Sequence, residues 1–194
     1  MSKRILDVKR GLPLLLAGLV ILIDQISKHL IASRWPIPSG SRHVFITDVF
    51  SNDFLHIIHV RNTAIAFSLG QNLPDPVKRV LFVIMPVIVL AVLTVYYFRS
   101  TEFTRLQRWA TAGILGGGIG NIIDRIFRPD GVVDFISVKF YGLFGFERWP
   151  TFNIADTSVV ICCLLLLATI FLGNGKKAKA PLPVLEGKSN EQKT

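Results

Sequence analysis

Four apolar segments, each close to the length of a bilayer-spanning helix, constrain the fold of this chain more than any other feature. They cover residues 12–32, 80–98, 109–127 and 154–173. A helix needs about 20 apolar residues to cross the hydrocarbon core of a bilayer. Hydrophobic residues make up 51% of the 194 residues and charged residues only 18%, which is too apolar for an ordinary soluble domain. The sequence therefore predicts an all-α membrane protein with four transmembrane helices.

The distribution of Lys and Arg predicts the side of the membrane on which each connecting segment lies. The N-terminal segment, the 99–108 connection and the C-terminal tail are much richer in basic residues than the stretches 33–79 and 128–153. Because basic residues are retained in the cytoplasm during insertion, both termini are predicted inside and the two long stretches outside. The formal charge of +9 arises largely from these flanking residues, so the sequence does not favour a nucleic-acid partner.

The first outer stretch, 33–79, is predicted to form a small β-rich platform. Its Val, Ile, Thr and Phe residues flank a turn signal at Ser51–Asp53, which is typical of short strands. Its aromatic residues suggest that one face rests on the membrane surface. The second outer stretch, 128–153, carries another strand candidate over 132–140. Residues 1–173 are thus predicted to form one membrane domain, and the polar, Lys-rich residues 174–194 a disordered cytoplasmic tail.

Polar side chains gather near the outer ends of three predicted spans. A charged group within the hydrocarbon core costs at least about 2.5–3.5 kcal/mol on insertion scales, so such groups require partners, water or a function. Their convergence predicts a shallow pocket that water can enter. The residues are Asp24 and Lys28 in the first span, Asn121, Asp124 and Arg125 in the third, and Asn153 and Asp156 at the start of the fourth.

Structural roles account for several of these residues when each is considered alone. Opposite charges at i,i+4 spacing, such as Asp24 and Lys28, pair on one helix face. Asp124 and Arg125 are also readily interpreted as a buried structural pair. A residue such as Asn153 is favoured as a helix N-cap, with Asp156 one turn later against the helix dipole. The G-x-x-x-G spacing in the third span favours close helix packing over phosphate binding.

Metal and thiol chemistry have less support. His56 and His59 are three residues apart in a strand-like segment, so they are expected on opposite faces and no metal site is predicted. Cys162 and Cys163 are neighbours inside the fourth span, which does not indicate a disulfide framework. They are predicted to pack as apolar residues.

Two carboxylates remain as candidates for acid–base chemistry. Asp134 and Asp156 lie on different outer elements, each near the membrane interface. Two carboxyls held close together share a proton, so that one can act as a base and the other as an acid. The residues alone leave three functions open: an acid–base hydrolase, an ion transporter that relays charge through Asp24, Asp124 and Asp156, and a structural membrane scaffold.

Five motifs together make the chain similar to a known family. They follow one another in the family's order across about residues 12–173, and their joint occurrence is highly specific. The motifs are DQISK (24–28), RNTAIAFS (61–68), GGGIGNIIDR (116–125), GVVDF (131–135) and FNIAD (152–156). The chain thus resembles the lipoprotein signal peptidases, the type II signal peptidase family. One departure is Ala64, where the family usually carries Gly.

The resemblance implies a specific activity and location. It implies an aspartyl endopeptidase of the bacterial inner membrane that cleaves prolipoproteins before a diacylglyceryl-modified cysteine, using neither metal nor organic cofactor. Its partners would be diacylated prolipoproteins and membrane lipid, and its active site would lie near the outer face. Asp134 and Asp156 match the catalytic pair, and Asp124 matches a position with a structural role. The matching substrate-binding or supporting residues are Asn62, Asn121, Arg125, Asn153, Asp24 and Lys28.

Overall fold

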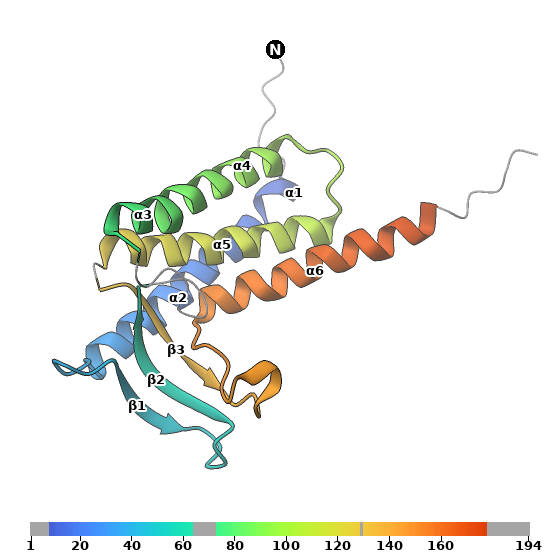
Figure 1. Cartoon of the computed structure of the whole chain (residues 1–194). Helices are drawn as coiled ribbons and strands as arrows, with labels where there is room; N and C mark the ends of the chain where they lie inside the picture. The colour runs from blue at the N-terminus through green and yellow to red at the C-terminus, as the bar shows by residue number, and fades with distance from the viewer. Residues whose placement is uncertain (1–7, 64–72, 129, 178–194) are drawn as a thin grey trace, which may run out of the picture.

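The structure is a computed structural model that describes residues 8–63, 73–128 and 130–177. Ala64 and residues 178–194, to which sequence predictions apply, lie outside these ranges. Helices dominate, and a small sheet lies at one end of the helix bundle (Figure 1). The helices are α1 (Val8–Gly11), α2 (Leu14–Arg34), α3 (Asp75–Arg79), α4 (Met85–Arg99), α5 (Arg105–Phe127) and α6 (Ile154–Lys177), and the strands are β1 (His43–Asp48), β2 (Leu55–Asn62) and β3 (Val132–Val138).

Among the residues that the structure describes, three helical segments are long and apolar enough to cross a membrane: Leu14–Arg34, Asp75–Arg99 and Ile154–Leu172. Large apolar side chains on them are exposed, as at Leu15 and Val92. Exposed apolar surface of this extent is typical of contact with lipid. The predicted membrane class is therefore confirmed for these three segments.

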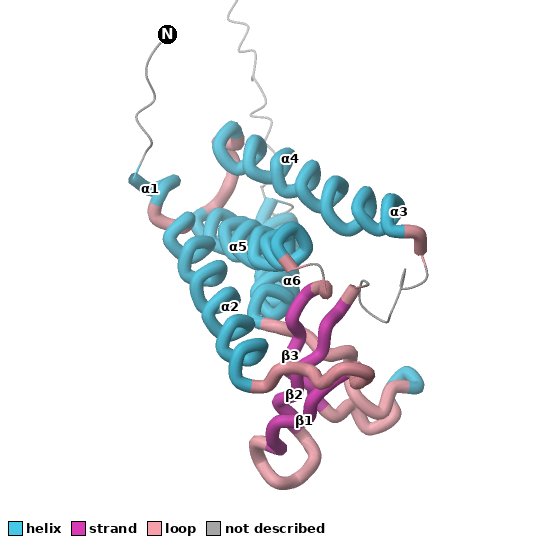
Figure 2. Tube along the Cα trace, turned by 90° about the vertical axis from the view of Figure 1, so that its left-hand side faces the viewer, coloured by secondary structure: helices cyan, strands magenta, loops and turns pink. Residues whose placement is uncertain are grey.

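Helix α5, which contains the third predicted span, residues 109–127, differs from the helices of the other three predicted spans. It packs against α2, α4 and α6 and occupies the middle of the bundle (Figure 2). A helix surrounded by protein exposes little surface to lipid, so it can contain Thr, Asn, Asp and Arg. Its mean hydropathy can therefore be lower than that of the other long helices. Although α5 has 23 residues, it is not among the three apolar segments. The count of four spans therefore stays a prediction.

Local sequence explains where α5 begins and how closely it packs. The Thr104 hydroxyl accepts a hydrogen bond from the Gln107 amide, and the Gln107 side chain accepts one from the Thr104 amide, which makes a capping box. Further along, a Cβ on Gly116 would lie 2.8 Å from the Ala17 backbone of α2. A Cβ on Gly117 would overlap the Ala155 carbonyl oxygen of α6. Gly116 and Gly117 therefore allow α2 and α6 to approach α5 closely. The G-x-x-x-G spacing predicted close packing at Gly116 and Gly120, and a Cβ on Gly120 would lie 3.3 Å from the Ala155 Cβ of α6.

The second span begins earlier than expected, because a helix already starts at Asp75. It passes through a π-helical turn, η2 (Val80–Ile84), before α4. Pro86 follows this turn and lacks an amide hydrogen, so a regular α-helical bond to the carbonyl four residues earlier cannot form there. The Met85 amide donates to the Val80 carbonyl instead, which is the wider π spacing.

The sheet is antiparallel, in the order β1-β2-β3. Its three strands agree with the predicted strand segments. The outer edge of β3 is tied to the segment before α6, because the Phe135 and Ile136 amides both donate to the Phe152 carbonyl, at 3.1 and 2.9 Å. This pairing places the middle of β3 beside the first turn of α6.

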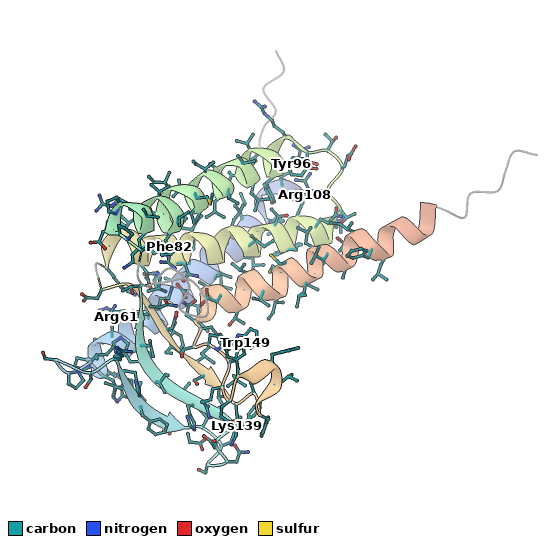
Figure 3. All side chains as sticks on the ribbon, viewed as in Figure 1. Arg61, Phe82, Tyr96, Arg108, Lys139 and Trp149 are labelled. Atoms are coloured by element: carbon teal, nitrogen blue, oxygen red, sulfur yellow. The ribbon has the colours of Figure 1, made fainter. Side chains whose placement is uncertain are left out.

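An ionic cluster fixes the far end of the sheet. Asp53 in the β1–β2 turn contacts Lys139 at 2.7 Å, Arg148 at 2.9 Å and His56 at 2.8 Å. Figure 3 shows Lys139 at this end of the sheet, well away from the helices. The cluster joins the β1–β2 turn to the segment that follows β3.

Candidate active site

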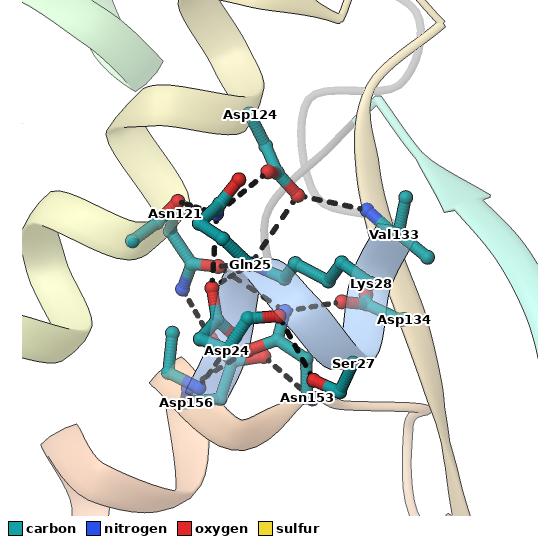
Figure 4. Close-up of polar contacts among 12 residues, drawn as sticks. Asp24, Gln25, Ser27, Lys28, Asn121, Asp124, Val133, Asp134, Asn153 and Asp156 are labelled. Carbon is teal, nitrogen blue, oxygen red and sulfur yellow. Dashed lines mark hydrogen bonds and ion pairs between the residues drawn. The ribbon is translucent and has the colours of Figure 1, made fainter. Parts of the chain in front are cut away.

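The structure brings Asp134 and Asp156 to one site, although β3 carries the first and α6 the second (Figure 4). Asn153 bridges them. Its side-chain amide donates to Asp134 Oδ1 at 2.7 Å, and its side-chain oxygen accepts from the Asp156 backbone amide at 2.9 Å. Both carboxyls also line the same cavity. The predicted meeting of the Asp134 and Asp156 side chains is thus observed.

The start of α6 explains how Asp156 is held. The Asp156 backbone amide donates to the Asn153 side-chain oxygen, and the Asn153 backbone amide donates to Asp156 Oδ2 at 3.2 Å. The two residues therefore cap the helix reciprocally and satisfy two amides that have no partner within the helix. The predicted N-cap role of Asn153 is correct, and it coexists with the contact to Asp134.

Asn121 on α5 reaches the same site from the opposite side. Its amide nitrogen donates to Asp156 Oδ1 at 2.7 Å. Its oxygen accepts from Lys28 Nζ at 2.9 Å and from Asn153 Nδ2 at 3.1 Å. Because both neighbours are donors, the oxygen must face them, and the amide nitrogen is left to face Asp156.

Asn62, near the end of β2, supports the other carboxyl. Its side-chain amide donates to Asp134 Oδ2 at 2.8 Å. Each oxygen of Asp134 therefore accepts an amide hydrogen bond, one from Asn62 and one from Asn153. Asp134 is only 2% exposed, so these two bonds take the place of hydrogen bonds to water.

A buried ionic cluster lies directly behind Asn121. Lys28 contacts Asp24 at 2.8 Å and Asp124 at 3.2 Å, and all three side chains are fully buried. Asp124 also contacts Arg128 at 3.0 Å and accepts from the Val133 amide at 3.2 Å. Its predicted structural role therefore involves α2, the end of α5 and β3 together.

Two further residues link this cluster to the neighbouring helices. Asp24 Oδ1 accepts from the Ala155 amide at 2.9 Å, which joins α2 to the first turn of α6. Gln25 donates to Asp124 at 3.0 Å and to the Gly120 carbonyl at 3.0 Å. Gln25 was not predicted as a site residue. The only signal was its place within the DQISK motif.

Burial raises the pKa of Asp134 to about 7, and the neighbouring charge of Asp156 acts in the same direction. The hydrogen bonds from Asn62 and Asn153 and the charge of Lys28 oppose this rise but do not cancel it. A carboxyl of this kind holds its proton at a pH where an ordinary aspartate is ionised. Asp134 is therefore suited to donate a proton near neutral pH.

The cavity at the two carboxyls has a volume of about 530 Å³. Its wall includes exposed apolar residues of α6, such as Val160 and Ile161, together with Asn62, Asn121 and Arg125. The Arg125 guanidinium lies 5.2 Å from the centre of the Phe82 ring, a cation–π distance that holds it at the cavity. Of the predicted supporting residues, Asn62, Asn121 and Arg125 line this cavity, Asn153 bridges Asp134 and Asp156, and Asp24 and Lys28 belong to the ionic cluster.

His56 and His59, which are three residues apart on β2, have separate surroundings. His56 faces Asp53 at 2.8 Å, whereas His59 Nδ1 lies 2.7 Å from the Trp35 carbonyl oxygen, to which it donates. In the described part of the chain, no three His, Cys, Asp or Glu side chains gather as a metal site would require.

Comparisons with known proteins agree with one another. The family described as signal peptidase (SPase) II matches residues 16–172. A protein named lipoprotein signal peptidase from Treponema pallidum is 45% identical over 159 residues, which cover 82% of each chain. One of the same name from Treponema denticola is 44% identical over 170 residues, covering 87% of this chain and 92% of that one. A solved structure described as a bacterial membrane enzyme superposes with a TM-score of 0.71 at 28% identity, covering 89% of this chain and 94% of that chain.

Proposed function

The chain belongs to the signal peptidase II family, and from this membership we propose that Asp134 and Asp156 are the catalytic pair with which it removes signal peptides from prolipoproteins. The observation that carries the proposal is that these two carboxyls line one cavity and are bridged by Asn153. An acid and a base on opposite sides of a scissile peptide bond are what metal-free hydrolysis requires.

The environments of the two carboxyls support different roles. Asp156 accepts hydrogen bonds from Asn121 and from the Asn153 amide, so it acts as the base and takes a proton from water. The water oxygen then bonds to the carbonyl carbon, while Asp134 donates its proton to the carbonyl oxygen. In the second step, the proton held by Asp156 passes to the leaving nitrogen as the carbon–nitrogen bond breaks. One proton from the resulting diol returns to Asp134, so the pair is restored.

The surrounding polar groups orient this pair and the substrate. Arg125 lines the cavity and has a planar fork that suits substrate carbonyl oxygens. Asn62, Asn121 and Asn153 hold the carboxyl groups at fixed positions. Asp24 and Lys28 act from behind, through α6 and Asn121. Such preorganisation lets the site act on charge that develops only during the reaction.

The location of the site supports a lipid-anchored substrate. We assign four spans, both termini to the cytoplasm of a bacterial inner membrane, and the sheet to the outer side as a platform. The cavity then lies at the outer interface, with α6 residues of its wall facing lipid. A diacylated cysteine and its signal-peptide helix both reach such a site by moving laterally in the bilayer.

A cleavage assay with purified protein tests the catalytic assignment. The wild type is expected to cleave a diacylated precursor, in the presence of EDTA, and to leave the unmodified precursor intact. Asp134→Asn and Asp156→Asn should each reduce the rate by at least roughly a thousandfold, because each removes a proton donor or acceptor. Asp75→Asn is the matched control, since the Asp75 side chain is 99% exposed. Full activity in either catalytic-site variant, with normal membrane insertion, would contradict the assignment.

A further inference from the structure

A second, larger cavity meets the catalytic one at Asp134. Its volume is about 1000 Å³, and Asn62 and Asp134 line both cavities. The second cavity extends across β2 between the segment after α2 and the segment before α6. A polypeptide bound across the catalytic pair would therefore have the residues before the scissile bond in one cavity and the residues after it in the other.

The two cavities offer different chemical surroundings. The catalytic cavity is walled largely by apolar groups, including Val159, Val160 and Ile161 of α6. The wall of the second cavity includes the hydroxyl residues Ser39, Ser41 and Thr63, several basic side chains and, apart from Asp134, one carboxylate, that of Asp130. The first suits a lipid-soluble segment, and the second suits a polar chain that leaves the membrane surface.

Positive charge is concentrated in the second cavity. His43 pairs with Val60 in the antiparallel register, so Arg42 precedes β1 at the level of Arg61 on β2. Both arginines line the cavity, and neither forms an ion pair with a carboxylate of the described residues. Figure 3 shows Arg61 where β2 approaches the helices. Arg148 also lines the cavity, but its guanidinium is already paired with Asp53.

Neighbouring groups do not neutralise this charge. Burial lowers the pKa of Arg61, the charge of Arg128 lowers it further, and Asp130 opposes both without cancelling them. His59, in the same wall, is buried, and burial lowers its pKa despite the hydrogen bond to the Trp35 carbonyl. It therefore stays neutral near pH 7, and the charge of the cavity resides in the arginines.

We propose that the second cavity holds the residues that follow the lipidated cysteine of the substrate, and that Arg42 and Arg61 favour acidic side chains in that segment. The proposal rests on the proposed function and adds a substrate preference to it. An anionic lipid headgroup is the other ligand that two arginines would suit. The polypeptide is favoured because the cavity shares Asp134 and Asn62 with the catalytic one, so the cleaved chain passes along it.

The test uses three diacylated precursors that are identical up to the cysteine. The next four residues are rich in Glu, in Ser or in Lys. Cleavage by the full-length protein is measured as kcat/KM in phosphatidylcholine vesicles, which carry no net anionic lipid. We expect the Glu substrate to be cleaved about 3–5-fold faster than the Lys substrate, the range of exposed charge pairs. The difference should fall toward unity in 1 M salt, where the screening length is about 3 Å.

Charge reversal provides the matched variants. Arg42→Glu should remove or reverse the preference for the Glu substrate, and Arg61→Gln should weaken it. Arg34→Glu makes the same charge change at an exposed residue outside the cavity. This variant should keep the wild-type preference for the Glu substrate. Equal cleavage of all three substrates by the wild type would overturn the proposal, as would a rate governed only by added anionic lipid. Cleavage of none of them would overturn the proposed function instead.

Discussion

Asp134 is the residue at which burial and chemistry are most closely linked. Its raised pKa, about 7, means that it loses its proton as the pH rises through neutrality. Because the proposed mechanism needs that proton, kcat/KM should decline above about pH 7. The hydrogen bond from Asn62 stabilises the ionised form, so its removal raises the pKa of Asp134 still further.

A variant at Asn62 tests this connection. Asn62→Ala should lower the overall rate and move the alkaline decline upward by about half to one pH unit, which corresponds to about 0.7–1.4 kcal/mol. Asn52→Ala, in the exposed β1–β2 turn, should leave the decline unmoved. The measurement is kcat/KM between pH 5 and pH 9 for the three proteins. If the alkaline decline of kcat/KM were unchanged in Asn62→Ala, Asp134 would not be the group whose ionisation causes it.

Lys28 is the single described cation that contacts both Asp24 and Asp124. Lys28→Met would leave two buried carboxylates without this partner, and breaking a buried pair costs about 3–5 kcal/mol. We expect a large loss of thermal stability in detergent, together with a loss of activity because Asn121 loses one of the donors that orient it. Lys78→Met, on α3, is the control and should have a small effect. A stable, active Lys28→Met protein would show that the cluster does not support the site.

At the scale of the helices, Asn121 on α5 reaches Asp156 on α6 because the two helices pack closely. Gly117 faces the Ala155 carbonyl and Val159 across this contact. Gly117→Ala should push the helices apart, with a loss of about 1–3 kcal/mol in unfolding free energy and a lower cleavage rate. Gly18→Ala is the matched control, because a Cβ there meets nothing within 4 Å. Thermal unfolding and cleavage rate are measured together, and equal behaviour of the two variants would exclude this role for Gly117.

At the scale of the whole molecule, the assigned topology places the β1–β2 turn and the α4–α5 connection on opposite sides of the membrane. In a background with both native cysteines replaced by Ala, Ser51→Cys should react with a membrane-impermeant maleimide added from outside. Glu102→Cys should react only after permeabilisation. Labelling of both sites in intact cells would contradict the topology.

The sequence predicted elements better than it predicted contacts. Long apolar runs and the strand segments near 43–70 and 132–140 depend on local periodicity, and the structure contains helices and strands there. The Asn153–Asp156 cap was also predictable, because both residues lie within one helical turn. The early start of the second span at Asp75 was missed, since prolines such as Pro74 and Pro76 are typical of a break in an apolar helical pattern.

Long-range polar contacts required more than local pattern. That Asp134 and Asp156 meet depends on β3 pairing with Phe152, and the residues alone left this open until the family motifs were considered together. Gln25 was missed because its role depends on Asp124 and Gly120 of another helix. The basic cavity was missed for the same reason, since Arg42 and Arg61 become neighbours only when β1 pairs with β2.

The bond from the Ala155 amide to Asp24 has a consequence for biosynthesis. The first long helix supplies the acceptor and the last helix the donor, so the chain closes on itself from both ends. A ribosome that has completed α5 and β3 has yet to make Asn153, Asp156 and the amide that Asp24 receives. Under the proposed mechanism, the nascent protein therefore stays inactive until the first turn of α6 has been synthesised, so chains that lack α6 do not cleave neighbouring polypeptides.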